Sequence, residues 1–159
     1  MSALAPHDER LLLAAIDLAQ QARDHGNHPF GALLATPSGD VLCEAENTVL
    51  TDRDVTRHAE LNLVSRASRT LTPDQLTTAT LYTSTEPCAM CSGAIYWSRI
   101  PRIVYAFGSD ELAALAGGGT ELTLHLSSRD VFAAGAPDVR VSGPHLGERA
   151  RAVHEGFWA

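Results

Sequence analysis

The sequence contains no lysine: its 12 basic residues are all arginine, and 19 acidic residues leave a formal net charge of −7. Proteins that grip long stretches of nucleic acid usually carry a net basic surface, and polybasic membrane anchors need clustered positive charge. The composition therefore argues against both classes. We expect no nucleic-acid partner, although an arginine patch assembled by folding would weaken this argument.

Cysteine is also scarce, with 3 in the chain. No segment approaches the ~20 consecutive apolar residues of a membrane span. Met1–Asp8 lacks the basic start of a secretory signal peptide, and charge interrupts the apolar residues that follow it. We expect a cytoplasmic, reducing location without membrane attachment. In that setting a close pair of cysteines is more often metal-binding or redox-active than a structural disulfide.

The residues that are present suit one compact domain covering residues 1–159. Hydrophobic residues make up 45% of the chain. A domain of this length buries roughly 70% of the surface that its unfolded chain exposes, so it supports a core without disulfides. Two domains of ordinary size would need a longer chain.

Apolar spacing predicts an α/β protein. Helical periodicity predicts helices over Asp8–His25, His58–Arg69, Pro87–Trp97, Asp110–Ala116 and Pro144–Phe157, with Thr56 as a cap of the second. Short apolar or alternating runs predict strands over Phe30–Thr36, Val41–Asn47, Thr80–Ser84, Arg102–Phe107 and Val139–Ser142, the first two forming a hairpin. Polar loops are expected over Thr48–Thr56 and around Pro73. This order predicts a three-layer α/β/α sandwich around a mixed sheet.

Two short segments contain residues suited to metal chemistry. Cys88 and Cys91 are three residues apart at the predicted start of a helix, so both sulfurs can point the same way. A helix N-terminus and a metal both lower a thiol pKa, which favours the thiolate that binds zinc. His58 adds an imidazole. Two cysteines and one histidine leave a coordination position open, which is typical of catalytic zinc.

Glu60 follows His58 by two residues and is predicted to lie near the metal without binding it. Zinc lowers the pKa of a bound water to about 7, and a nearby carboxylate can carry its proton to a substrate nitrogen. The pattern H-x-E followed by P-C-x-x-C is the signature of zinc deaminases. The sequence therefore predicts Glu60 as the proton shuttle of a deaminase.

Two other interpretations of the cysteine pair stay open. A C-x-x-C pair can be a thioredoxin-like redox site, although that motif needs no upstream His-x-Glu. A structural zinc site would need a fourth ligand, and the remaining cysteine, Cys43, is predicted to be a small core residue. The other histidines are predicted to be surface or loop residues: His7, His25, His28, His125, His145 and His154.

At these motifs the sequence resembles the cytidine-deaminase-like superfamily, and within it the branch of bacterial guanine deaminases and tRNA adenosine deaminases. The resemblance extends roughly from Leu11 to Asp110 and includes Pro29-Phe30-Gly31. It implies a five-stranded mixed sheet between helices, one zinc per chain and a homodimer. It also implies that Asn47 and the backbone N–H of Ala59 bind the ring of a base.

Four further assignments depend on this resemblance. Phe30 is expected in the pocket wall or in the core, and Trp97 against a base or in a dimer interface. Asp110 would substitute for acidic residues that guanine deaminases carry after an Ala-Gly pair, because Ala116-Gly117-Gly118-Gly119 has none. Phe157 and Trp158 would complete the last helix or form a stacking lid.

The resemblance favours a small free nucleobase or nucleoside, with a guanine-type purine first. A tRNA adenosine deaminase is the main alternative, but the chain lacks the lysine and the basic last helix typical of those enzymes. Cytosine, cytidine or another amino-heterocycle also remains open as the substrate. A non-catalytic zinc protein that binds a nucleotide is the rival from a different class, and Glu60 argues against it.

Overall fold

The structure is a computed structural model, and it describes residues 4–117, 124–136 and 138–158. Its helices are α1 (Pro6–Asp24), α2 (Val49–Asp52), α3 (Ala59–Thr70), α4 (Pro73–Thr78), α5 (Ala89–Ser98), α6 (Ser109–Leu115), α7 (Ser128–Ala133) and α8 (Gly147–Ala152). Its strands are β1 (Gly31–Ala35), β2 (Val41–Glu46), β3 (Thr80–Thr85), β4 (Arg102–Phe107) and β5 (Arg140–Ser142). In the described part of the chain, no helix is both long and apolar enough to cross a membrane.

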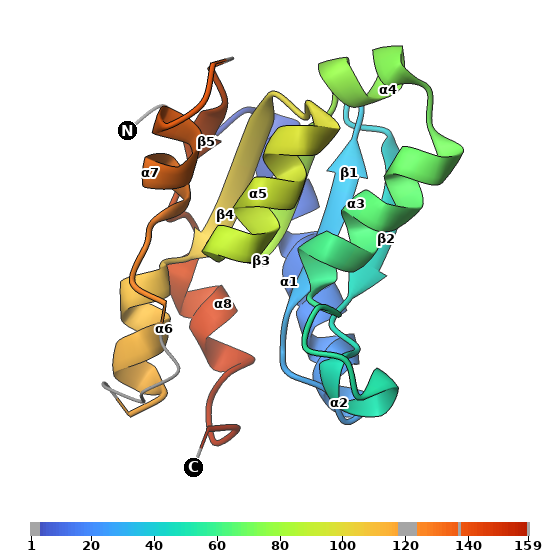
Figure 1. The fold of residues 1–159 in the computed structure, drawn as a ribbon. Coiled ribbons are helices and arrows are strands. Elements are labelled where there is room, and N and C mark those ends of the chain that lie inside the picture. The colour runs from blue at the N-terminus through green and yellow to red at the C-terminus, as the bar shows by residue number, and fades with distance from the viewer. Residues whose placement is uncertain (1–3, 118–123, 137, 159) are drawn as a thin grey trace.

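The strands form one mixed sheet in the order β2-β1-β3-β4-β5. Strand β1 pairs antiparallel with β2 and β3, which confirms the predicted hairpin, and β3, β4 and β5 run parallel. Figure 1 shows α3 and α5 on one face of the sheet and α1 on the other. The predicted α/β/α sandwich with a five-stranded mixed sheet is therefore confirmed.

Each face of the sheet has its own apolar core. One core joins α3 and α5 to the sheet through residues such as Leu63, Ile95 and Ile103, and it includes Cys43, as predicted. The other joins α1 and α8 to the opposite face. Gly31 lies where α1 approaches β1, and a Cβ there would come within 2.5 Å of the Ala15 carbonyl oxygen. The glycine of the Pro29-Phe30-Gly31 segment is thus needed for this close packing.

Four local predictions were wrong. The segment around Pro73 is helix α4, capped where Thr72 accepts a hydrogen bond from the Gln75 N–H at 3.3 Å. Val49–Asp52 is a short helix within the predicted loop. The cap of α3 is His58, whereas Thr56 bonds to Asp54. The last helix ends at Ala152, well before the predicted end.

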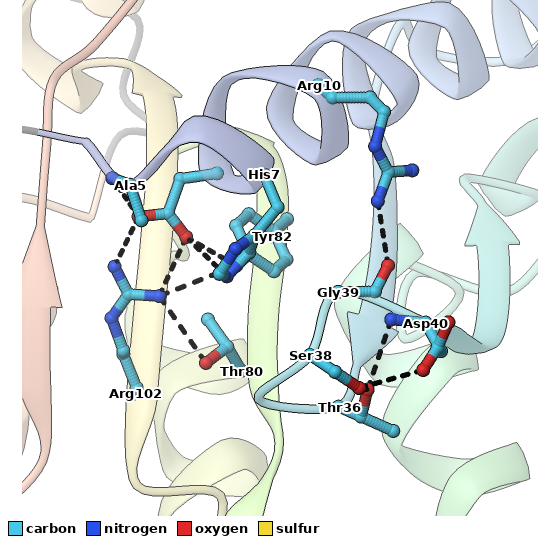
Figure 2. A network of polar contacts seen from close by, with 11 residues as sticks. Ala5, His7, Arg10, Thr36, Ser38, Gly39, Asp40, Thr80, Tyr82 and Arg102 are labelled. Carbon is cyan, nitrogen blue, oxygen red and sulfur yellow. Dashed lines mark hydrogen bonds and ion pairs between the residues drawn. The ribbon is translucent and has the colours of Figure 1, made fainter.

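A buried ion pair ties the start of α1 to the sheet (Figure 2). Asp8 has no exposed surface. It accepts hydrogen bonds from Arg102 at 2.8 and 2.9 Å and from the Tyr82 hydroxyl at 2.6 Å. Burial alone would raise the pKa of Asp8, but these donors lower it well below its usual range. The carboxylate is therefore ionised when the protein is folded at neutral pH.

We expect Asp8→Ala to lower the free energy of unfolding by about 3–5 kcal/mol, because it leaves the Arg102 charge without its partner. Urea denaturation of the variant measures this loss. Asp17→Ala is the matched control, because Asp17 is exposed on the same helix. A loss within about 0.5 kcal/mol for Asp8→Ala, as surface changes usually give, would contradict this role.

Candidate active site

Three potential zinc ligands meet where α3 and α5 begin. His58 is the N-cap of α3, Cys88 is the N-cap of α5, and Cys91 lies in the first turn of α5. In Figure 1 both helices begin at the same edge of the sheet, to which the C-terminal segment also returns. Cys88 follows strand β3, and His58 follows the segment after strand β2. The fold therefore joins ligands that are 30 residues apart in the sequence.

The ligand atoms have the spacing of a zinc site. His58 Nδ1 lies 3.6 Å from Cys88 Sγ and 3.5 Å from Cys91 Sγ, and the three ligand atoms all lie within 4.8 Å of one another. A tetrahedral zinc, with bonds of about 2.1 Å to nitrogen and 2.3 Å to sulfur, separates such atoms by about 3.5 Å. The residues present therefore fit zinc with three protein ligands.

The electrostatics of this group favour a thiolate. A hydrogen bond from the Cys91 thiol, with help from His58, lowers the pKa of Cys88 to about 4. The same hydrogen bond and burial raise the pKa of Cys91. Contact with Cys88 raises the pKa of His58, against the effect of burial. Before a metal binds, this group holds one negative sulfur at neutral pH, which is the form that attracts a cation.

Glu60 is beside this group but under the protein surface. It lies in the first turn of α3 with 5% of its surface exposed. Burial raises its pKa, and a hydrogen bond from the Thr83 hydroxyl, 2.7 Å from Oε1, opposes that rise. Thr83 therefore fixes one carboxylate oxygen. A positioned carboxyl group with a raised pKa suits proton transfer near neutral pH.

Asn47 lies at the end of β2 and is fully buried. Its backbone N–H donates to the Phe30 carbonyl at 3.0 Å, and its Oδ1 accepts from the Val49 N–H at 3.0 Å. Its Nδ2 has no hydrogen-bond partner among the described residues. Ala59 is the first residue of α3, where backbone N–H groups have no acceptor within the helix. Both residues offer donors to a ligand.

Two predicted site residues are exposed to solvent. Trp97 is 81% exposed near the end of α5, nine residues after Cys88. A helix rises 1.5 Å per residue, so Trp97 is about 14 Å along α5 from the cysteine. Asp110 is exposed in the first turn of α6. The structure thus does not bring Trp97 to the zinc ligands of its own chain. The role of Asp110 stays a prediction. The loop glycines Gly118 and Gly119 lie outside the described residues.

A group of rings at the same edge of the sheet was not predicted. This C-terminal ring cluster consists of His28, Phe30, Phe107, His154, Phe157 and Trp158. Phe157 follows α8 and contacts His28 and Trp158, so the prediction that it completes the face of the last helix was wrong. His154 was predicted to lie at the surface or in a loop, but only 1% of it is exposed. The aromatic end of the sequence was the one signal for this cluster.

Glu86 fastens the cysteine segment to two later helices. One carboxylate oxygen accepts from the Ser109 hydroxyl at 2.9 Å, and the other accepts from the Ser128 hydroxyl at 2.7 Å. Both serines also donate their backbone N–H to Glu86. These hydrogen bonds lower the pKa of Glu86 although burial opposes them. Glu86 therefore holds α6 and α7 against the segment that leads to Cys88.

Comparison with known proteins decides the family. The model of the cytidine and deoxycytidylate deaminase zinc-binding region matches residues 5–107, which contain both motifs. The chain belongs to this family. It is 42% identical to a probable cytosine deaminase of Schizosaccharomyces pombe over 156 residues, covering 98% of this chain and 94% of that protein. It is 41% identical to the guanine deaminase of Bacillus subtilis over 99 residues, covering 62% of this chain and 63% of that protein.

A solved structure from a study of A-to-I editing by tRNA:A34 deaminases shares the fold. Its TM-score is 0.70 at 25% identity, and the match covers 91% of this chain and 99% of the other. The predicted superfamily, the zinc cofactor and the class of hydrolytic deaminases are thereby confirmed. The relatives act on different substrates, so family membership does not select one.

Proposed function

We propose that residues 1–159 form one domain that hydrolytically deaminates a small free nucleobase. The observation that carries this proposal is the juxtaposition of His58, Cys88 and Cys91 with the buried carboxyl group of Glu60. A structural zinc site would need a fourth ligand and no proton carrier. A retired site that only binds nucleotides would not need Glu60 either.

Each residue near the ligands has a task in this reaction. Zinc, when bound, supplies a water whose pKa is lowered to about 7. Glu60 would take one proton from this water and pass it to a ring nitrogen, then take the remaining proton of the added hydroxyl group and pass it to the leaving amine, so that the carbonyl forms and ammonia departs. Thr83 holds Glu60 Oε1, which keeps the carboxyl group in one orientation. Asn47 and the N–H of Ala59 orient the ring, and Phe30 forms part of the wall.

A free base fits the charge distribution better than tRNA. Folding does bring Arg102, Arg129 and Arg140 around one cavity of about 260 Å³. However, Arg102 begins β4 and is paired with Asp8, whereas Phe107 ends β4 beside the site. At about 3.3 Å per residue, the two ends of β4 are about 17 Å apart.

Guanine and cytosine are the two leading substrates. The resemblance of the motifs to guanine deaminases favours guanine. A specific observation favours cytosine: the match to the probable cytosine deaminase continues through the C-terminal segment, whereas the match to the guanine deaminase covers 62% of this chain. We also propose a homodimer, because Trp97 is 81% exposed on the apolar helix α5.

Ammonia release from a substrate panel tests this proposal. The panel contains guanine, cytosine and adenine, their nucleosides, and a tRNA anticodon stem-loop. We expect the zinc-loaded protein to have its highest kcat/KM with cytosine or guanine, above the matching nucleoside. Turnover of the stem-loop alone would overturn the choice of a free base. Zinc binding without ammonia from any compound would favour the non-catalytic rival.

A further inference from the structure

Buried polar atoms without hydrogen-bond partners gather at the edge of the sheet that carries the zinc ligands. Among the described residues there are four: Glu46 Oε2, Asn47 Nδ2, Thr85 Oγ1 and His154 Nε2. Glu46 ends β2 and Asn47 follows it, Thr85 ends β3, and His154 packs against Phe107 at the end of β4. A buried polar group without a partner is destabilising, and a ligand at this edge of the sheet would offer acceptors to Asn47 Nδ2 and His154 Nε2.

The chemistry of His154 identifies its free atom as a donor. The indole N–H of Trp158 lies 3.2 Å from His154 Nδ1, and an indole can only donate. Nδ1 must therefore be the unprotonated acceptor. Burial and the nearby Arg23 lower the pKa of His154 to about 4, so the ring is neutral at neutral pH. The single ring proton is then on Nε2, and this buried N–H has no acceptor among the described residues.

Neighbouring rings connect His154 to residues of the candidate active site. Its ring packs at 5.4 Å from Phe30, whose carbonyl accepts from Asn47. It also stacks at 5.5 Å on Phe107, whose carbonyl accepts from Glu86 two residues before Cys88. Its partner Trp158 stacks on His28, and both burial and the charge of His58 lower the pKa of His28. His154, near the C-terminus, and Asn47, which follows β2, thus both contact Phe30.

We propose that His154 is a specificity residue whose Nε2–H donates a hydrogen bond to the ring carbonyl of the substrate. Asn47 Nδ2 is the second free donor, and Trp158 holds the His154 ring in the tautomer that donates. This inference rests on the proposed deaminase activity and narrows its substrate class. Two neutral donors favour a base with a carbonyl group, and deamination requires that the base also carry an amino group. Cytosine and guanine have both groups, whereas adenine has no carbonyl.

The test compares each base with an analogue that lacks the carbonyl: cytosine with 4-aminopyrimidine, and guanine with 2-aminopurine. If cytosine is the better substrate, cytosine and 4-aminopyrimidine are compared; if guanine is better, guanine and 2-aminopurine are compared. Wild-type protein gives KM and kcat for the base, and competition gives the inhibition constant of the analogue. We expect His154→Phe to weaken recognition of the base by about 10- to 100-fold, mainly in KM, because one hydrogen bond is lost. The inhibition constant of the analogue should stay within about twofold of its value with wild-type protein.

Three control variants separate recognition from folding. His154→Gln retains an N–H donor and should recover part of the discrimination between base and analogue. Trp158→Phe keeps a ring but loses the indole N–H, so it should lose part of the discrimination. His145→Phe is the matched control, because His145 bonds to Ser142 of β5, and it should discriminate as wild type does. Thermal unfolding and zinc content show which variants are folded.

The outcomes are distinct from those that test the deaminase activity itself. If wild-type protein releases no ammonia from any base, the proposed function fails. If wild-type protein is active and folded His154→Phe keeps the same preference for the base over its analogue, the role of His154 is overturned. An equal loss for base and analogue in His154→Phe would also overturn it, because that pattern indicates a disturbed pocket without selective recognition of the carbonyl.

Discussion

Glu60→Gln should retain one zinc per chain and lose about 10²- to 10⁴-fold in kcat, the usual contribution of a general acid–base group. Zinc should remain because the side chain that changes is not one of the three ligands that meet at the ends of α3 and α5. The fold should also remain, because glutamine can still accept the hydrogen bond from Thr83. The amide cannot take up and release a proton, so the loss should fall on kcat. Steady-state ammonia release and metal analysis of the same sample measure both quantities.

Glu9→Gln is the matched control for this substitution. Glu9 is exposed on α1, so the same chemical change there should leave kcat and zinc content as in wild type. Normal turnover by folded Glu60→Gln protein would refute the proton-shuttle role. Loss of zinc in that variant would instead place Glu60 among the metal ligands.

Cys88→Ala should lower bound zinc well below one per chain and abolish turnover. This thiol has its pKa lowered to about 4, so it is the sulfur best prepared to bind a cation as a thiolate. Its loss leaves His58 and Cys91 as the remaining members of the group. Zinc that binds the folded protein also stabilises it by mass action. A chelator should therefore lower the melting temperature of wild-type protein and have little effect on Cys88→Ala.

Cys43→Ala is the matched control, because it shows whether the loss of a cysteine that is not a ligand also lowers zinc content. Cys43 is a buried core residue under α3, so its replacement should lower stability and leave zinc content near one per chain. Zinc content is measured by metal analysis after dialysis. One zinc per chain in Cys88→Ala would refute the assignment of Cys88 as a ligand.

The three potential zinc ligands and the buried carboxyl group of Glu60 beside them could be predicted from the sequence because each motif is local. In His58-Ala59-Glu60 and in Cys88 to Cys91 the spacing and the helix start together specify the arrangement. Only the meeting of the two motifs depends on the fold, and two helices that begin at the same edge of a sheet provide it. The long amphipathic helix α1 and the strand β4 were likewise readable from periodicity.

The short helices were harder to predict from the sequence, because part of their stability comes from contacts with residues distant in the sequence. The capping pair Thr72 and Gln75 was a readable signal for α4. Helix α7 has a local cap, in which Ser127 accepts from the Asp130 N–H, but its start is also bonded to Glu86, which is 42 residues away from Ser128. No local pattern reports such a contact.

The role that we propose for His154 could not be predicted for the same reason. His154 has no motif around it, and its importance comes from Phe30, Phe107 and Trp158, which the fold gathers around it. Trp97 was predicted to contact a base or lie in a dimer interface, and its place near the end of α5, away from the ligands of its own chain, leaves the interface as the alternative that the exposed indole favours.

The most direct test of hydrolytic deamination is the fate of the oxygen atom. Zinc-loaded protein would convert cytosine or guanine in water enriched in the heavy oxygen isotope, and mass spectrometry would follow the product base. We predict one heavy oxygen in each product molecule and one ammonia released per turnover, with both lost in Glu60→Gln. Product without the heavy oxygen, or no conversion of either base by folded, zinc-loaded protein, would contradict the account.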